Sequence, residues 1–380
     1  MRIAYFVHDL CDPAVARRIT MLRCNGVNVA LLGFHRDSEP PADIAGVPTV
    51  ALGRTHDARM ANRAAQVVAA ARRGRQIAAD LGSVDAILAR NLEMLAVAGA
   101  VRRHLPGRVP LTYEVLDIHR LLLDGGVKGR ALRAIEARLA ADASGIITSS
   151  PAFVRHYFEP LSGVRAPIHL VENKLLGWDT RAEETRVAGP PWRIGLFGAL
   201  RDRRSMDLIV KIARDLDGLA EIVVRGRPSP AVFPDLAAEL ADAPHVAFHG
   251  AYRNPDDLAA IYADVHFAWS IDYYEAEANS EWLLPNRLYE GGFYGAVPIA
   301  RENTEIAHFL AKRDYGIVLG PDPAGELAAY LKGLDAEAYQ REAARVAAVP
   351  RSDFVATEAD CADLVARLTR TLPQGTRLAA

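Results

Sequence analysis

Short apolar runs alternate with amphipathic stretches along most of the chain. Residues 2–8 form an apolar run rich in β-forming residues, and Asp12-Pro13 follows it. Asp is a good helix N-cap and Pro fits the first helical turn, so a helix is predicted from about residue 13 to residue 24. The next apolar run covers residues 27–34. This strand–helix–strand unit predicts parallel pairing with a right-handed crossover.

The same alternation continues to residue 149. Strands are predicted at 86–89, 111–115 and 145–149, and helices at 59–81, 91–104 and 127–141. Short apolar strands that alternate with helices are typical of a doubly wound α/β domain.

A polar stretch at residues 176–192 interrupts this rhythm and contains Gly-Pro-Pro near its end, as expected for an interdomain linker. A second series follows, with strands predicted at 193–198, 221–226, 245–250, 265–269 and 296–300, and helices at 204–217, 234–241, 255–263 and 286–294. The halves share this architecture but no sequence repeat.

The pattern therefore predicts an α/β protein with two Rossmann-like doubly wound domains that face a cleft. The expected boundaries are 1–175 for the N-terminal domain, 176–192 for the linker, 193–352 for the C-terminal domain, and 353–380 for a C-terminal helix that packs back on the N-terminal domain. Ligands of open α/β sheets bind beyond the carboxyl ends of the strands, so these ends are where functional residues are sought.

Size and composition agree with two folded domains. The chain has 380 residues, of which 50% are hydrophobic, and domains typically have about 100–200 residues. No apolar run reaches the roughly 18 residues that a membrane-spanning helix needs, and the first residues do not form a signal peptide. The three cysteines are scattered without metal-ligand spacing, which predicts reduced thiols in a cytoplasmic protein.

Charge is distributed unevenly between the halves. Residues 1–190 carry 25 Lys and Arg against 19 Asp and Glu, whereas residues 191–380 carry 20 against 28. A basic N-terminal half fits an anionic surface or a phosphorylated acceptor. An unevenly charged but simply solvated surface is an equally good interpretation.

Several common catalytic motifs are absent from the sequence. It contains no G-x-G-x-x-G, no G-x-x-x-x-G-K-[ST], no G-x-S-x-G and no H-E-x-x-H. Dinucleotide-dependent redox chemistry, P-loop hydrolysis, serine esterase activity and zinc protease activity are therefore disfavoured.

The first stretch with informative chemistry begins at Gly198, where a glycine near the end of a strand lets a ligand approach the backbone. Arg201, Arg203 and Arg204 follow where a helix begins. Positive charge opposes the macrodipole at a helix N-terminus. A bound phosphate would offset that cost and accept hydrogen bonds from the free N–H groups. A solvated basic turn is the alternative.

The second stretch is a predicted helix that begins at Pro285 or Asn286. It places Arg287 in the first turn and Glu290 one turn later, and it carries three glycines, which are unfavourable in helices and indicate close packing or a nearby ligand. A carboxylate on an otherwise apolar helix can accept two hydrogen bonds from a vicinal diol such as ribose. An ordinary surface glutamate is the alternative.

Together these stretches resemble the donor-site signature of GT-B-fold glycosyltransferases, especially the family-4 group and its members that build exopolysaccharides. The family pattern of Pro, a basic residue, Leu, an aromatic residue and Glu, followed by Gly and Pro, is matched by Pro285, Arg287, Leu288, Tyr289, Glu290, Gly295, Pro298 and Ile299. The earlier Gly-x-Leu-x-x-x-Lys of the family is matched by Gly198, Leu200 and Arg204. The resemblance is strong from residue 193 to residue 300 and looser before that.

This resemblance implies roles for the donor residues. Glu290 would hold the donor ribose, Arg204 with Arg201 would bind the diphosphate, and Arg287 would support phosphate or sugar. Many members carry a second glutamate eight positions before the first, where this chain has Trp282. Either Glu281 takes that role in a loop longer by one residue, or the role is absent. Gly198 and Asn286 complete the predicted donor site.

In the N-terminal half, the segment 113–119 ends a predicted strand and resembles the family's Tyr-Asp-x-His-Glu/Asp segment. Transfer to a hydroxyl needs a group that accepts its proton. Asp117 is the first candidate, and Glu114 and His119 come after it. A structural role, in which these acids cap the next segment, is as good an interpretation for any one of them.

The expected function is transfer of a sugar from a nucleoside-diphosphate sugar, with UDP-sugar the first choice. The acceptor implied by the resemblance is a saccharide, in particular a lipid-linked oligosaccharide in bacterial exopolysaccharide synthesis. No cofactor, metal or nucleic-acid partner is expected. The arginine-rich segments 59–75 and 128–138 fit either peripheral contact with an anionic inner membrane or solvated helix faces. A sugar-nucleotide epimerase of the same fold and a non-catalytic GT-B partner subunit are the alternative functions.

Overall fold

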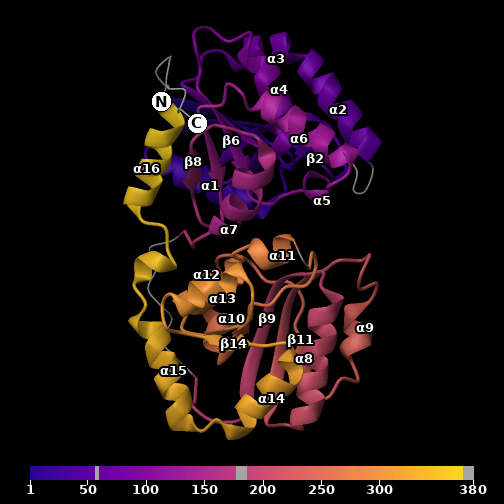
Figure 1. The fold of residues 1–380 in the computed structure, drawn as a ribbon, viewed down its shortest axis with the longest axis vertical. Coiled ribbons are helices and arrows are strands. Elements are labelled where there is room, and N and C mark those ends of the chain that lie inside the picture. Colours follow the sequence, from indigo (N-terminus) through magenta and orange to yellow (C-terminus); the bar gives the residue numbers. More distant parts are fainter. Residues whose placement is uncertain (56–59, 177–185, 277, 371–380) are drawn as a thin grey trace. The chain divides into compact units, whose positions relative to one another are not determined.

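The computed structural model describes residues 1–55, 60–176, 186–276 and 278–370. The chain divides into two compact units (Figure 1). The first consists of Met1–Glu172 together with the segment that begins at Thr357, and the second of Asn173–Ala356. Most of the segment predicted as a linker, residues 177–185, lies outside the described residues.

The described residues of the first unit form an eight-stranded sheet with the order β3-β4-β2-β1-β5-β6-β7-β8. Its strands are β1 (Arg2–Val7), β2 (Asn28–His35), β3 (Asp43–Ile44), β4 (Val47–Arg54), β5 (Ala86–Arg90), β6 (Leu111–Val115), β7 (Gly145–Thr148) and β8 (Ile168–Leu170). All neighbours pair in parallel except β3 with β4. The strand order reverses between β1 and β5, which is the place where such sheets bind ligands, at the carboxyl ends of the strands.

Helices connect these strands. They are α1 (Pro13–Arg23), α2 (Met60–Arg72), α3 (Gly74–Leu81), α4 (Asn91–Arg102), α5 (Arg120–Leu123), α6 (Val127–Leu139), α7 (Pro151–Phe153) and the π-helix η1 (Val154–Ser162). The predicted helix at 59–81 is two helices, because Gly74 lies against the backbone of α4. A Cβ at this position would come within 3.0 Å of the Ala100 carbonyl group.

The segment after residue 356 also belongs to the first unit. Its helix α16 (Glu358–Thr369) begins with a capping box in which Thr357 and Asp360 bond each other's backbone N–H groups. Cys361, Leu364 and Leu368 are buried on its inner face, and the helix contacts α1 and β5. Its apolar face therefore completes the core of a unit whose other residues lie more than 180 positions earlier.

The described residues of the second unit form a six-stranded, fully parallel sheet with the order β11-β10-β9-β12-β13-β14. Its strands are β9 (Trp192–Leu200), β10 (Ala220–Pro228), β11 (Val246–Phe248), β12 (Phe267–Trp269), β13 (Val297–Arg301) and β14 (Ile317–Leu319). Here too the order reverses beside the first strand, between β9 and β12.

The helices of the second unit are α8 (Arg203–Leu216), α9 (Leu236–Leu240), α10 (Leu258–Ala263), α11 (Asn279–Trp282), α12 (Asn286–Phe293), α13 (Glu305–Ala311), α14 (Pro323–Gly333), α15 (Ala336–Ala348) and the 3₁₀ helix η2 (Arg351–Asp353). Its largest core cluster includes Trp192 on β9 and Trp269 on β12, both fully buried. Each unit is thus a parallel sheet between helices, which confirms the predicted α/β class with two Rossmann-like units.

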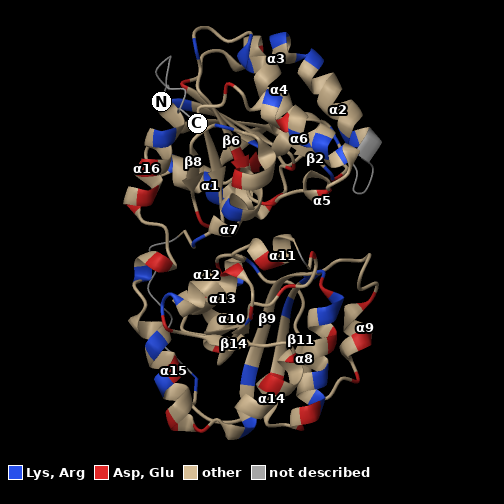
Figure 2. Cartoon of the chain, viewed as in Figure 1, with Lys and Arg blue, Asp and Glu red and all other residues tan. Residues whose placement is uncertain are grey.

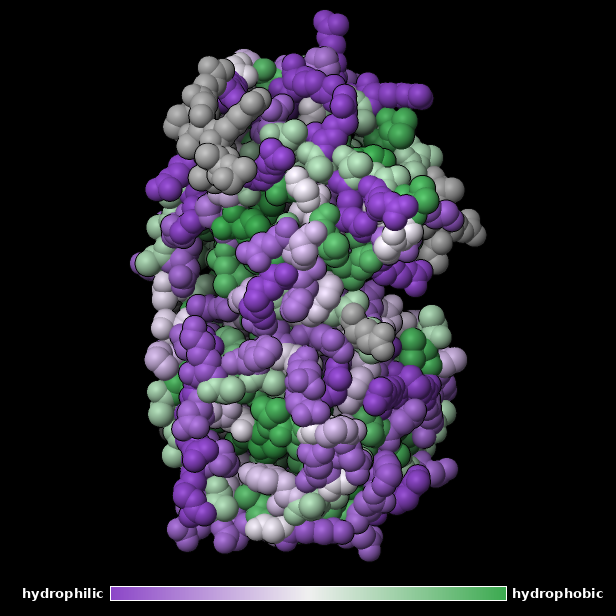
Figure 3. All heavy atoms as spheres, viewed as in Figure 1, coloured by the Kyte–Doolittle hydropathy of each residue, from purple (hydrophilic) through white to green (hydrophobic). Residues whose placement is uncertain are grey.

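Polar residues dominate the surface. In the space-filling view hydrophilic residues cover most of the visible face, and hydrophobic residues are interspersed among them (Figure 3). Basic residues follow α2 and α3 in the first unit, and acidic residues occur on α9 and α14 in the second (Figure 2). Within the described ranges, no helix has both the length and the apolar character needed to cross a membrane.

Candidate functional site

Gly198 lies near the carboxyl end of β9, where the backbone adopts a φ of +117°. Residues with a Cβ rarely adopt this conformation, so the position favours glycine. A Cβ built at Gly198 would meet no described atom within 4 Å. The backbone at the start of the candidate donor site is therefore open to a ligand.

Helix α8 begins two residues after β9 ends, and Asp202 is its N-cap. The Asp202 carboxylate accepts hydrogen bonds from the Ser205 backbone N–H at 3.1 Å and from the Ser205 hydroxyl at 2.5 Å. It also accepts one at 2.7 Å from the backbone N–H of Tyr273, which follows β12. One side chain thus fixes the start of α8 against the loop after the neighbouring strand.

The three predicted arginines of this segment have different surroundings. Arg201 and Arg204 are exposed, and their guanidinium carbons lie 4.3 Å from the ring centroid of Tyr274 and 4.1 Å from that of Tyr273. Among the described residues neither arginine forms an ion pair. Arg203 instead turns away, because it stacks on Phe233 and donates to Glu239 and the Val232 carbonyl. Arg201 and Arg204 are therefore the pair available to an anion.

Arg287 lies in the first turn of α12 and is 13% exposed. Its Nη2 donates to the Ile271 carbonyl at 2.8 Å and lies 3.5 Å from Asp272 Oδ2. Asn286, the first residue of the helix, is exposed. The structure thus brings the predicted Arg287 to the same loop after β12 that carries Tyr273.

Glu290 lies one turn further along α12 and is only 4% exposed. Its Oε1 accepts from Asn254 Nδ2 and its Oε2 from the Tyr262 hydroxyl, both at 3.1 Å. Burial, and next the charge of Glu290, raise the pKa of Tyr262 well above its usual value, so that hydroxyl stays a donor. Glu290 is therefore not an ordinary surface glutamate.

The glycines of α12 have a packing role. A Cβ at Gly291 would lie 2.8 Å from the Ala268 Cβ on β12, and one at Gly292 would lie 2.3 Å from the Phe354 ring. The two glycines let the helix lie directly against the sheet and against the segment that follows η2. Close packing, the first of the two explanations for these glycines, accounts for both positions.

Glu281 lies on α11 and is paired with Arg301, whose Nη2 is 3.1 Å from Glu281 Oε1. Arg301 is the last residue of β13, and its guanidinium carbon is 5.2 Å from the Tyr273 ring centroid. Glu281 therefore lies at the same sheet edge as Arg204, although Trp282 occupies the position that the family pattern assigns to glutamate.

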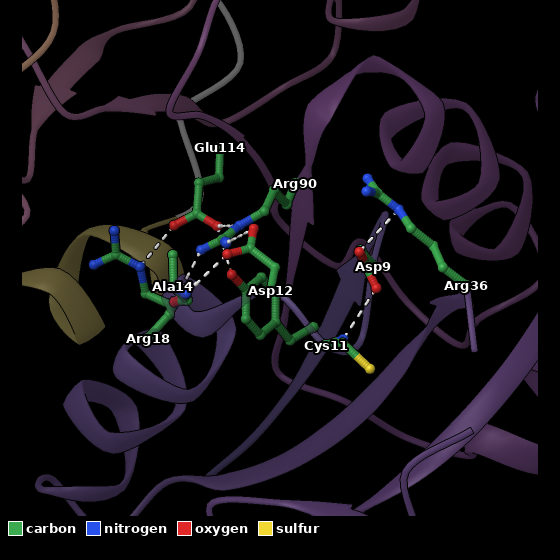
Figure 4. A network of polar contacts seen from close by, with 9 residues as sticks. Asp9, Cys11, Asp12, Ala14, Arg18, Arg36, Arg90 and Glu114 are labelled. Atoms are coloured by element: carbon green, nitrogen blue, oxygen red, sulfur yellow. Dashed lines mark hydrogen bonds and ion pairs between the residues drawn. The ribbon is translucent and has the colours of Figure 1, made fainter. Parts of the chain in front are cut away.

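In the first unit, Glu114 is fully buried on β6 and is held by two arginines (Figure 4). Arg18 Nε on α1 is 2.6 Å from Glu114 Oε1, and Arg90 Nε on β5 is 2.7 Å from Glu114 Oε2. The Tyr5 hydroxyl donates to Oε2 at 2.6 Å. Arg90 also pairs with Asp12, the N-cap of α1, at 2.9 Å.

This network determines the chemistry of Glu114. Burial favours the neutral acid, but the two guanidinium groups outweigh it and lower the pKa of Glu114 to about 2. A buried carboxylate with such a low pKa and both oxygens bonded is a poor proton acceptor. Glu114 is thus a structural ion-pair centre, and its predicted catalytic role is not favoured.

The other two candidates follow β6 on an exposed segment. Asp117 and His119 are both exposed. His119 caps α5, and its Nδ1 accepts from the Leu121 backbone N–H at 3.2 Å. That bond requires an unprotonated Nδ1, so the neutral ring carries its proton on Nε2 and neither nitrogen is ready to accept another. Asp117 therefore remains the best candidate base.

Some functional candidates were missing from the sequence prediction. They are Tyr273, Arg301, Asp202 and Asp272 at the edge of the second sheet, Asn254 and Tyr262 around Glu290, and Arg90 beside Glu114. Strand-end position was a usable signal for Arg90 and Arg301, each the last residue of a strand. Within the described ranges, no group of three or more His, Cys, Asp or Glu residues could hold a metal ion.

Comparison with known proteins agrees with this geometry. Residues 13–174 match the model of the glycosyl transferase 4-like domain. The succinoglycan biosynthesis protein ExoL of Rhizobium meliloti (strain 1021) is 46% identical over 98% of this chain and 95% of its own length. Among solved structures, the sucrose-phosphate synthase of Thermosynechococcus elongatus superposes with a TM-score of 0.71 at 14% identity, over 96% of this chain and 98% of that one. HepE of Anabaena, solved with UDP-glucose, superposes with a TM-score of 0.68 at 14% identity, over 97% of this chain and 100% of that one.

Proposed function

Because this chain belongs to the glycosyltransferase 4-like family that includes ExoL and has a GT-B fold, we propose that it transfers a sugar from UDP-sugar to a saccharide acceptor in exopolysaccharide synthesis. The observation that carries the proposal is that Arg204 and Glu290 lie in one unit and are linked through one loop. Arg204 stacks on Tyr273 of that loop, and Arg287, on the same helix as Glu290, bonds the Ile271 carbonyl within it.

The donor site follows from these contacts. Arg204 and Arg201 stand beside the open backbone at Gly198 and the N-terminus of α8, where positive charge and N–H groups suit a diphosphate. As the sugar leaves, negative charge develops on that diphosphate, and fixed arginines stabilise it. Glu290, as a buried carboxylate on α12, takes the ribose hydroxyls. HepE was solved with UDP-glucose, which supports uracil as the base.

On the acceptor side, Asp117 is the proposed general base. The carboxylate takes the proton of the attacking hydroxyl as its oxygen forms a bond to the sugar's anomeric carbon and the bond from that carbon to the diphosphate breaks. Glu114 does not touch the acceptor in this scheme. It ties β5, β6 and α1 together, and thereby fixes the strand end from which Asp117 projects.

A lipid-linked acceptor would place the protein at the inner membrane surface. Helix α6 supports this contact, because its exposed side includes apolar Val127 and Ile135, 73% and 51% exposed. Lys128, Arg130 and Arg138 on the same helix are also exposed. Apolar and basic side chains on one surface helix are the combination that peripheral binding to anionic lipid requires.

The first experiment is thermal unfolding with UDP, GDP and other nucleoside diphosphates. A ligand at 100 times its dissociation constant adds about 2.7 kcal/mol of stability, which is a readily measured shift. The expected result is stabilisation by UDP that is lost in Arg204→Ala. No stabilisation by any nucleoside diphosphate at millimolar concentration would contradict the proposal.

A second assay separates transfer from the alternative reactions. With radiolabelled UDP-sugar, a transferase consumes the donor rapidly only when an acceptor is added. An epimerase would convert the donor sugar alone, and a non-catalytic subunit would leave it unchanged.

A further inference from the structure

Three hydrogen-bond donors at the edge of the second sheet are buried with no partner among the described residues. They are the Tyr273 hydroxyl, Arg287 Nε and Arg301 Nε. Tyr273 as a whole is 8% exposed. Buried polar groups are nearly always hydrogen-bonded, and an unpaired one is costly, so three together require an explanation.

The three donors come from segments that meet around Tyr273. The guanidinium carbons of Arg204 and Arg301 lie 4.1 Å and 5.2 Å from the centroid of its ring. Arg287 donates to the Ile271 carbonyl two residues before Tyr273. The Tyr273 backbone is held by Asp202 at the start of α8. The ring therefore contacts Arg204 of α8 and Arg301 at the end of β13, while Arg287 of α12 holds the loop that carries it.

Arg204, Arg287 and Arg301 bring positive charge to this site. Asp272 and Glu281 balance part of it, because they pair with Arg287 and Arg301. Arg204 has no ion-pair partner among the described residues. Burial, the largest effect, raises the pKa of Tyr273, although both arginines oppose it. The hydroxyl is thus a neutral donor that faces no acceptor, which is the complement of a phosphate oxygen.

We infer that the Tyr273 hydroxyl and Arg301 are further donor-binding groups that hydrogen-bond a phosphate oxygen of the nucleoside-diphosphate sugar alongside Arg204. This inference rests on the proposed function and extends it, since neither residue belongs to the family signature. Phosphate oxygens accept several hydrogen bonds at once, and so would pair donors that have no partner among the described residues.

The inference predicts opposite effects of one substitution on stability and on binding. Tyr273→Phe keeps the ring, and with it the stacking of Arg204 and Arg301, but removes the unpaired hydroxyl. The unliganded variant should therefore unfold at the same temperature as the wild type or higher. Its affinity for UDP should fall about tenfold, as expected for one hydrogen bond to a charged group.

A comparison of two ligands shows which part of the nucleotide loses a contact. Isothermal titration with UDP and with uridine, which lacks phosphate, should show weaker UDP binding and unchanged uridine binding in Tyr273→Phe. Arg301→Gln should likewise weaken UDP binding more than uridine binding. Equal losses for both ligands would contradict a phosphate contact.

Tyr315→Phe is a matched control. Tyr315 is 4% exposed, its hydroxyl also lacks a partner among the described residues, and it precedes β14 at the opposite end of the sheet. This variant should match Tyr273→Phe in stability but bind UDP like the wild type.

The outcomes separate this inference from the proposed function. If Tyr273→Phe binds UDP like the wild type while Arg204→Ala loses binding, the donor site stands and the role of Tyr273 is overturned. If the wild-type protein binds no nucleoside diphosphate, both fail.

Discussion

Arg90 and Glu114 are direct neighbours across the pairing of β5 with β6, and their side chains meet with Arg90 Nε 2.7 Å from Glu114 Oε2. Both are shielded from solvent, at 1% and 0% exposure. Charged residues are rarely buried at adjacent positions in the middle of a sheet, and here each is tolerated because of the other. The second arginine, Arg18, leaves the cluster with an excess positive charge that Asp12 offsets.

Removing Glu114 should therefore strongly destabilise the first unit. Glu114→Ala leaves Arg18 and Arg90 buried without their shared partner, and breaking a buried ion pair in this way costs about 3–5 kcal/mol. Urea unfolding monitored by circular dichroism measures the effect. Asp117→Ala, three positions along on the exposed segment, is the control and should change stability by less than about 1 kcal/mol. Equal effects of the two substitutions would contradict the assigned roles.

The same carboxylate should make stability depend on acid pH. The pKa of Glu114 is about 2 in the folded protein and near 4.3 in an unfolded chain. Its contribution is thus complete above about pH 4.5 and is lost as the pH falls from there towards 2. In Glu114→Gln this component disappears, so stability should fall less steeply over that range. Identical slopes for variant and wild type would show that Glu114 does not titrate in this way.

Asp117→Asn should lower turnover with little change in donor binding. Loss of a general base typically costs about 10²- to 10⁴-fold in rate, whereas the proposed UDP site lies in the second unit. Transfer kinetics with a fixed acceptor, combined with UDP titration, separate the two effects. His119→Asn preserves a side chain that can cap α5, so this variant should retain most activity. A loss of activity as large as that of Asp117→Asn would indicate that His119, and not Asp117, is the base.

Glu290→Gln should remove the protein's discrimination for the ribose hydroxyls. The wild type is expected to bind UDP about tenfold or more tightly than 2′,3′-dideoxy-UDP, because Glu290 accepts from the diol. In the variant the two affinities should converge, with UDP weakened and the dideoxy analogue little affected. If the wild type binds both nucleotides equally, Glu290 does not contact ribose.

Charge reversal on α6 should weaken binding to anionic lipid. Lys128→Glu with Arg130→Glu removes two basic side chains, each worth about 1 kcal/mol near an anionic surface. Sedimentation with phosphatidylglycerol-containing vesicles should show less bound protein, and neutral vesicles should bind neither form. Lys211→Glu on α8, also an exposed lysine but in the second unit, is the control. Unchanged sedimentation of the α6 variant would exclude this helix as the contact.

The central strands were predictable because each is a nearly continuous apolar run, as burial on both faces requires. Several strands at or near the sheet edges were not, although the edge strand β11 was. β3 has two residues, β8 and β14 have three each, and β4 alternates irregularly and exposes Val50. A strand this short gives little periodicity to detect, so β3, β8 and β14 are defined by their neighbours in the sheet, whereas β11 and β12, also of three residues, were predicted from longer apolar runs.

The candidate site also contains residues that the sequence predicted and residues that it did not. Arg204 and Glu290 were predictable from local spacing, since a strand end and a helix turn place them. The role of Glu114 was not, because Arg18 and Arg90 lie 96 and 24 positions away in sequence, and nothing near Glu114 indicates that they converge on it. Tyr273 and Arg301 were not predicted from the sequence for the same reason. Their significance depends on contacts between the ends of different strands.

The return of α16 to the first unit affects the order in which the protein is made. A ribosome delivers Met1–Glu172 before Asn173–Ala356, and the helix that covers part of the first unit's core, with Cys361, Leu364 and Leu368 on its inner face, follows both. During synthesis the surface of α1 and β5 that α16 covers therefore stays exposed while the whole second unit is translated and can fold. The nascent first unit has an uncovered apolar face during that interval, and completion of its core must wait until α16 has been translated.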